Sequence, residues 1–487
     1  MAGILAAAIA VGIYYGRHGQ SELQVQKTKL RAQGEKLTLA EVLPGRVATG
    51  PSRIKDLVRL VRELEVAGAP PYSIVAMTHE AGGTVRPTWQ LPAPQDWRSK
   101  APRFPAMPTG RANLWQDLSL QVSAAEPALK DLREFLKVPD RDFAWNYDYV
   151  SQTPPDYHHV QKRLAAQWLS SVVTSQLHDS RLTDAQENLR GLISLARWHS
   201  EEWMLTSQMV RLAVANMALQ ATWAALQAPG WSEPQLAEFQ AAFESLPTAP
   251  GFTRVIEVER AQIESVFDAM NRSGAEVFDK VFAGGGSSGA ADRFRYAAWR
   301  AVMAERDELF FLRESQHSLA AMRGFARDKS WASTRLAFEE QQRRFTAEFA
   351  GMRGQMLMVS GMMIPNLEKA FTTVARYETR RELTVAAIAL RRHQLRHRKS
   401  PASLGSLVPE LLTSVPVDYM DGKPLRYRLN ADGTFVLYSV GLDGKDDGGN
   451  PAPVTTGKPF DDIFDGRDAV WPQPTNNAPA KVTPAAK

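Results

Sequence analysis

The chain has 487 residues, of which 44% are hydrophobic and 23% are charged, and this composition excludes disordered, collagen-like and polytopic membrane proteins. A formal net charge of +5, spread over so long a chain, is too dilute to indicate a nucleic-acid partner. Because the chain contains no cysteine, thiolate metal sites, disulfides and a cysteine nucleophile are also excluded.

Residues 1–16 read MAGILAAAIAVGIYYG and predict a membrane anchor, because the run is apolar and ends in two tyrosines beside Arg17. The run is shorter than the roughly 20 residues that span a bilayer. Either the anchor is marginal or the chain begins further upstream, and a buried Ala-rich helix of the globular body is the alternative. Basic residues just after the run would hold the following segment in the cytoplasm, whereas the far end of the chain argues for the opposite side.

Residues 17–109 are predicted to form a stalk helix and a Pro-rich connector. Apolar residues at helical spacing from Leu57 to Leu64 predict the helix, which should stop at Gly68. Six prolines between Arg86 and Pro108 rule out a helix there and predict an extended connector.

Residues 110–380 are predicted to form an irregular array of helices. An apolar residue recurs every four positions from Val160 to Val172, and a long apolar stripe from Leu205 to Leu226 predicts a central helix with Trp223 in the core. Capping boxes at Thr183 and Ser232 predict two helix starts. The fold class is therefore mainly α, with an N-terminal anchor helix and a small C-terminal α+β hairpin module.

Histidine and glutamate pairs in this array have competing interpretations. The neighbours His158 and His159 are interpreted as a satisfied or exposed pair. His393 and His397 have metal-ligand spacing, but the surrounding arginines favour a solvated basic helix end. The pair Glu201–Glu202 is the basis of an alternative function, a hydrolase of an envelope polymer with carboxylates inside the helical domain.

Residues 381–472 predict a separate module, and residues 473–487 a disordered tail. Two short runs, 424–429 and 434–440, are rich in β-branched and aromatic residues and flank a turn at 430–433, which predicts a hairpin. The loop 441–449 then combines three aspartates with four glycines. Carboxylates and glycine-exposed carbonyls are the oxygen ligands that Ca²⁺ prefers, although a solvated surface loop is an equal alternative. The candidate metal ligands are Asp443, Asp446, Asp461, Asp462 and Asp468.

The same region resembles the globular end of the major (G-type) pseudopilins of type II secretion over about 90 residues. The matching features are the helical run 386–390, Pro401, the stretch from Val415 to Asp418, Gly422-Lys423-Pro424, Tyr427 and the Tyr438–Gly444 loop. The resemblance implies that Asp443 is the calcium-binding aspartate of the loop and that Asp468, before Trp471, is the terminal one, with Asp461 and Asp462 competing for that role. The whole chain resembles uncharacterised membrane-anchored bacterial envelope proteins.

These expectations combine into a functional hypothesis. The chain is predicted to be a non-catalytic envelope protein, anchored in the inner membrane by residues 1–16, with its bulk in the periplasm and a possible link to secretion. It is expected to bind an envelope protein partner through its helical domain, to bind Ca²⁺ at the C-terminal module and to bind no nucleic acid. Its oligomeric state is not specified by the sequence. A subunit of a secretion pilus is a weaker third alternative.

Overall fold

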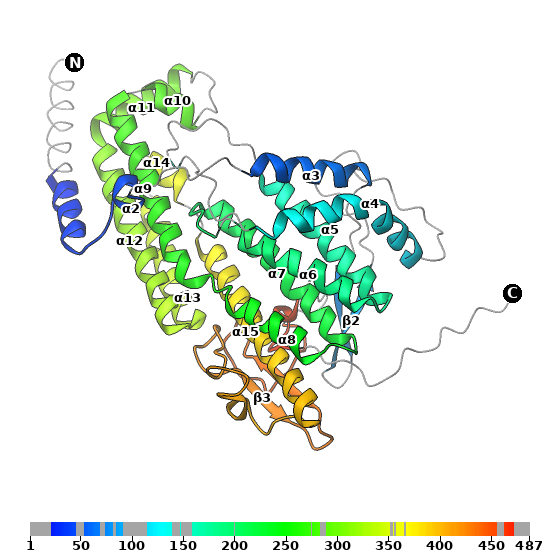
Figure 1. Ribbon diagram of the computed structural model, residues 1–487. Helices are drawn as coiled ribbons and strands as arrows, with labels where there is room; N and C mark the ends of the chain where they lie inside the picture. The colour runs from blue at the N-terminus through cyan, green and yellow to red at the C-terminus, as the bar shows by residue number, and fades with distance from the viewer. Residues whose placement is uncertain are drawn as a thin grey trace, which may run out of the picture.

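The computed structural model describes residues 21–44, 53–68, 74–80, 84–90, 114–138, 147, 158–198, 200–273, 275–282, 289–350, 354, 357–364, 367–454 and 462–471. The described chain is mainly helical and carries a small three-stranded antiparallel sheet near its C-terminus (Figure 1). This confirms the predicted mainly α class. No described helix is long and apolar enough to cross a bilayer, and both the predicted anchor, 1–16, and the predicted tail, 473–487, lie outside the described residues.

The helices follow a helical segment over residues 21–32. They are α2 (Leu39–Val42), α3 (Ile54–Val66), α4 (Leu114–Leu136), α5 (His158–His178), α6 (Leu182–Arg197), α7 (Leu205–Gln227), α8 (Glu233–Glu244), α9 (Ala249–Ser273), α10 (Ala275–Phe282), α11 (Ala290–Val302), α12 (Ala304–Asp328), α13 (Trp331–Phe349), α14 (Met358–Met363) and α15 (Leu367–His397).

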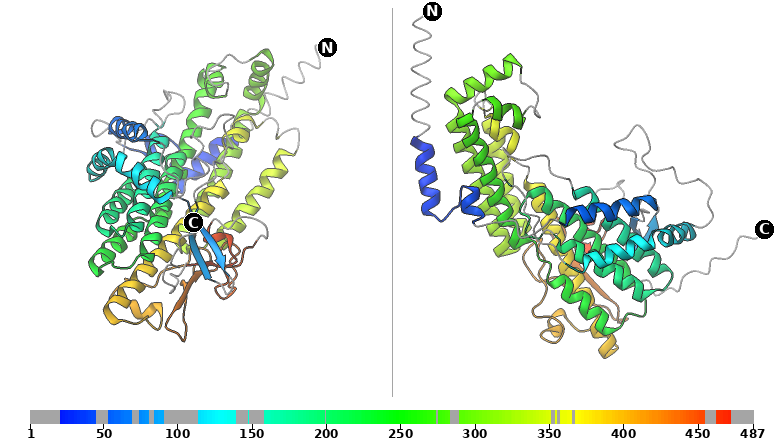
Figure 2. Two further views of the ribbon diagram at one scale, coloured as in Figure 1. Left: turned by 90° about the vertical axis from the view of Figure 1, so that its right-hand side faces the viewer. Right: turned by 45° about the horizontal axis from the view of Figure 1, so that its top comes forward.

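Two hydrophobic cores organise these helices. The larger core joins α3–α8, α13 and α15, together with the first turns of α9. It buries Trp168 and Trp223, as the periodicity predicts. The smaller core lies in an arm where α9 and α12 run together, capped by α10, α11 and α14 (Figure 2, right). The long helices α9 and α12 pass from one core into the other and so join the arm to the main body.

One predicted helix start is confirmed and the other is wrong. Ser232 caps α8 with the predicted box, in which the Gln235 side chain accepts the Ser232 backbone N–H at 3.0 Å. Helix α6 begins at Leu182, one residue before the predicted cap Thr183. Arg181 occupies the N-cap position instead, and its side chain pairs with Asp184 at 2.6 Å.

The N-terminal region packs on the body, which differs from the predicted stalk. Helix α3 buries Leu57, Leu60, Val61 and Leu64 against α4 and α5, because an apolar stripe of this width needs a partner surface. Residues 21–37 pack in the same way on α12, beside the arm (Figures 1 and 2). The first residues of the predicted extended connector, 86–90, lie in the strand β2 (Thr84–Gln90), which pairs with β1 (Ile74–Glu80) in an antiparallel hairpin that was not predicted. Residues 91–113 lie outside the described part.

The C-terminal region forms the predicted hairpin and adds a third strand. Strands β3 (Arg426–Leu429) and β4 (Phe435–Ser439) pair antiparallel, and β5 (Ala469–Val470) joins β4. The predicted turn closes with Gly433 at φ = 81°, a conformation that favours glycine. The predicted boundary at 380/381 falls inside α15, which is buried on both sides of that point and shares one core with β4. For these reasons the module continues the helical body, and we use "the module" for residues 400–471.

Candidate functional site

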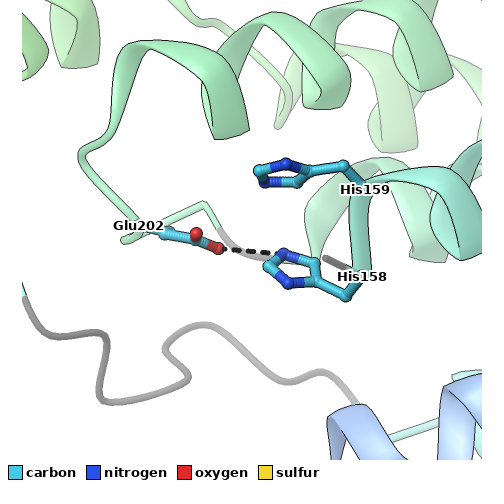
Figure 3. A group of neighbouring side chains, drawn as sticks. All are labelled: His158, His159 and Glu202. Atoms are coloured by element: carbon cyan, nitrogen blue, oxygen red, sulfur yellow. Dashed lines mark ion pairs between the residues drawn. The ribbon is translucent and has the colours of Figure 1, made fainter. Parts of the chain in front are cut away.

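A buried polar cluster lies where α5 begins. His158 and His159 are the first two residues of α5, and Glu202 lies in the connection between α6 and α7 (Figure 3). The side chains of His158 and Glu202 are 0% exposed, and His158 Nε2 lies 3.5 Å from Glu202 Oε2. One ligand atom from each of the three side chains lies within 4.8 Å of the other two. No other group of three or more His, Asp or Glu side chains in the described residues meets this distance.

Helix α7 holds the Glu202 carboxylate in place. The Ser207 hydroxyl donates to Glu202 Oε1 at 2.5 Å, and the same hydroxyl oxygen lies 2.9 Å from His159 Nε2. The Gln208 side-chain amide donates to the Glu202 backbone carbonyl. Because Ser207 touches both His159 and the carboxylate, the first turn of α7 fixes the cluster relative to α5.

Lys162 lies near the cluster, and Arg211 lies near Lys162; both positive charges affect the pKa values of the groups in this region. Lys162, one turn after His158, is buried, and its ammonium donates to the Trp198 carbonyl at 2.7 Å. Burial lowers the pKa of Lys162 to about 7, an effect that Glu202 opposes and Arg211 reinforces. Burial would raise the pKa of Glu202, but the neighbouring His158 and the hydrogen bond from Ser207 outweigh it and lower that pKa. Burial and the neighbouring His158 lower the pKa of His159 to about 4.

Sequence reasoning treated the members of this cluster separately. The sequence predicts His158 and His159 to be a satisfied or exposed pair, and it places Glu202 only beside Glu201. In the structure Glu202 is buried whereas Glu201 is exposed, so the two carboxylates do not face one cleft. No short spacing joins His158 to Glu202, because they approach only when α5 packs on α6 and α7. The paired-carboxylate form of the hydrolase alternative therefore lacks geometric support.

The aspartate-rich loop is closed around Asp468. Its carboxylate is fully buried and accepts the backbone N–H groups of Asp447, Gly449 and Asn450 at 3.3, 2.8 and 2.8 Å. Gly441 has φ = 69°, and a Cβ at this position would lie 2.4 Å from the Arg467 carbonyl oxygen. The loop therefore packs at both ends, Gly441 and Gly449, against Arg467 and Asp468, the two residues just before β5.

The other predicted ligands of the loop are exposed and bonded locally. Asp443 accepts the Lys445 backbone N–H at 3.0 Å. Asp446 accepts the Tyr438 hydroxyl at 3.0 Å, and its second oxygen lies 3.5 Å from Arg426 Nε. A calcium ion bound here would therefore compete with Arg426 for Asp446.

Asp462 is turned toward α15 and Asp461 lies outside the described residues. The Arg380 guanidinium donates to both carboxylate oxygens of Asp462 at 2.6 and 2.5 Å, and Arg376 lies 3.5 Å away. Burial would raise the pKa of Asp462, but the two arginines outweigh it and lower that pKa. This ion pair attaches the module to α15. Asp462 therefore has a structural role, because its carboxylate is occupied by Arg380 and is not turned toward the aspartate-rich loop.

Comparison with known proteins adds no neighbour for this chain. No family model matches it, and neither a curated protein nor a solved structure shows significant similarity to it. The resemblance to pseudopilins therefore remains a prediction that depends on the quoted motifs alone.

Proposed function

We propose that the chain is a non-catalytic protein of the bacterial envelope, anchored to the inner membrane by residues 1–16 and exposed to the periplasm. Its helical body and module act as one scaffold that binds a protein partner, and Ca²⁺ stabilises the module. The observation that supports the scaffold part of this proposal is the course of α15, a 31-residue helix of the body on which the module packs.

Side chains along α15 tie separate parts of the chain together. The Glu378 carboxylate accepts the backbone N–H groups of Thr248 and Ala249 at the start of α9, at 2.5 and 2.8 Å. Arg380 binds Asp462 of the module, and Arg392 lies 2.7 Å from Glu233 at the start of α8. These contacts join the module and the body into one packed unit, which supports a common scaffold.

We assign the partner surface to a groove of about 600 Å³ beside α3. Its wall combines apolar side chains with three cations and one acid. Val66 in this wall is 89% exposed, and Arg59 pairs with Glu63 at 2.7 Å, which leaves a positive surplus. By charge complementarity the occupant is an acidic segment of a partner protein with apolar residues on one side. The lining residues are Ile54, Lys55, Val58, Arg59, Arg62, Glu63, Val66 and Gln161.

Site-specific photocrosslinking in cells tests this surface. A crosslinker at Val66 should give a discrete adduct, whereas one at the exposed Val454 of the module should not. The charge reversals Lys55→Glu and Arg62→Glu together should abolish the adduct, while Arg391→Glu, an exposed reversal on α15, should leave it intact. An adduct that survives the double reversal, or no adduct at position 66, would overturn the assignment.

A reporter that is active only outside the cytoplasm tests the topology. Fused to the C-terminus, it should be active, and the fusion should sediment with the membrane fraction. Activity of a cytoplasm-only reporter at the same position would refute the periplasmic placement.

Calcium dependence of stability tests the metal part of the proposal. Asp443→Ala should lower the melting temperature of the full chain in calcium and have little effect after chelation, because an ion that binds only the folded state stabilises it by mass action. Asp432→Ala, in the exposed hairpin turn, is the control and should behave alike in both conditions. Equal shifts for Asp443→Ala with and without calcium would remove the ion from this account.

A further inference from the structure

We propose that His158, His159 and Glu202 form a binding site for a divalent transition-metal ion of the zinc class, separate from the calcium loop. Two imidazoles and one carboxylate are a donor set typical of such ions. The carboxylate is oriented by Ser207, as the outer partners of metal ligands commonly are. The scaffold function does not depend on this site.

Only small side-chain movements would be needed to bring the three ligand atoms to the distances of a metal site. With metal–ligand bonds of about 2.0–2.2 Å, the ligands of a tetrahedral site lie about 3.3–3.6 Å apart. The three ligand atoms here already lie within 4.8 Å of one another, and the pair from His158 and Glu202 is at 3.5 Å. A rotation of the half-buried His159 ring would close the remaining difference, and a water would supply the fourth position.

The charge of Lys162 is the main electrostatic cost of a bound cation. Its ammonium is held by the Trp198 carbonyl, and its charge is felt by both His159 and Glu202. A hard ion that depends on several carboxylates finds only one here, which disfavours Ca²⁺ and Mg²⁺. Neutral imidazoles bind ions of the zinc class more strongly than they bind Ca²⁺ or Mg²⁺. The donor set therefore favours the zinc class even with Lys162 nearby.

A bound metal ion would link the start of α5 to the connection between α6 and α7. The histidines belong to the first turn of α5, Glu202 to the connection after α6, and Ser207 to the first turn of α7. Because His158 and Glu202 are fully buried, the ion would sit in an enclosed position between the helices. The ion therefore has a stabilising role in the helical body.

Titration of the chelator-treated full chain with Co²⁺ tests the proposal, since the visible absorption of Co²⁺ reports its coordination. We expect one site with a tetrahedral spectrum, displaced by Zn²⁺, and a higher melting temperature of the chain with Zn²⁺. His159→Gln should weaken binding by more than about tenfold, because removing even an outer partner of a ligand costs about 10–100-fold in affinity. Glu202→Gln should do the same while keeping the shape of the buried side chain.

A second histidine pair provides the control. His393 and His397 have ring centroids 4.4 Å apart on α15 and are the competing site for the same ions. The double variant His393→Gln, His397→Gln should keep the spectrum and the melting shift. Loss of both in this variant, or their persistence in His159→Gln, would overturn the proposal. Because His159 is only half-buried, His159→Gln is expected to fold even if Glu202→Gln does not, and its melting without metal verifies this.

Discussion

The buried charges of the N-terminal segment, residues 21–44, and the buried carboxylates that close the loops of the module have different kinds of partner. In the N-terminal segment, charged side chains meet charged side chains of distant helices. Lys27 lies 3.0 Å from Glu264 of α9 and also pairs with Glu308 of α12. Glu35 lies 3.0 Å from the fully buried guanidinium of Arg260.

In the module, carboxylates mainly meet backbone N–H groups. Asp468 accepts three of them, and the buried Asp418 accepts those of Met420 and Val440 at 3.0 and 2.9 Å. Arg426 is an additional partner of Asp418 at 3.1 Å.

The difference follows from what each backbone leaves unsatisfied. Helices pair their own N–H and C=O groups except at their ends, so a buried charge that faces the middle of a neighbouring helix needs a side-chain partner. Loops leave N–H groups without a regular partner, and a buried carboxylate can accept several of them. We therefore expect a substitution in the N-terminal segment to leave a charge unpaired, and one in the module to leave amides unbonded.

Lys27→Met should give the largest effect. Burial and the charge of Glu308 raise the pKa of Glu264 to about 8, and Lys27 is the cation that opposes this. Removing it raises the pKa values of the buried Glu264 and Glu308 further, so the folded chain must take up a proton or bury an uncompensated charge, and we expect a loss of about 3–5 kcal/mol. Hydrogen exchange should show that residues 21–32 lose protection, and urea unfolding should show the lower stability. Lys29→Met, at an exposed position of the same helix, is the matched control; an effect no larger than the control's would contradict the charge-pairing account.

In the module, Asp468→Asn should lower the unfolding free energy by less than Lys27→Met does. The asparagine keeps one acceptor oxygen but places an NH₂ group against backbone donors, so we expect a loss of about 1–3 kcal/mol in chelator. Asp443→Asn, at an exposed position with a single backbone bond, should change the unfolding free energy by less than about 0.5 kcal/mol. Similar losses in the two variants would show that the amide bonds of Asp468 are not what holds the loop.

The sequence predicted features that short segments determine. The Ser232 cap and the hairpin turn at Gly433 need only neighbouring residues, and both are confirmed. The Thr183 cap is wrong by two residues, because the N-cap of α6 is Arg181 and Thr183 lies in the first turn of the helix. The packing of α3 and the approach of Glu202 to His158 could not be predicted, because their partners lie on helices that are distant in the sequence. The burial of Glu202 beside an exposed Glu201 likewise depends on tertiary packing.

Glu35→Gln should give the smallest effect and should sharpen the comparison by its pH dependence. Burial would raise the pKa of Glu35, but hydrogen bonds from Arg323, Gln316 and Arg260 outweigh it and lower that pKa from 4.5 to about 2. The unfolded chain therefore takes up a proton first as the pH falls, so the stabilisation is complete above about pH 5 and is lost between about pH 4.5 and 2. Allowing for solvent screening at its partner Arg323, whose side chain is 41% exposed, the contribution is about 1–2 kcal/mol. The difference in unfolding free energy between the wild type and Glu35→Gln should shrink from pH 6 to pH 3, measured by urea unfolding. Because Gln keeps the shape and one acceptor oxygen, a difference that stays constant over this range would mean that Glu35 acts through packing and hydrogen bonding, and that its charge is not what attaches the N-terminal segment.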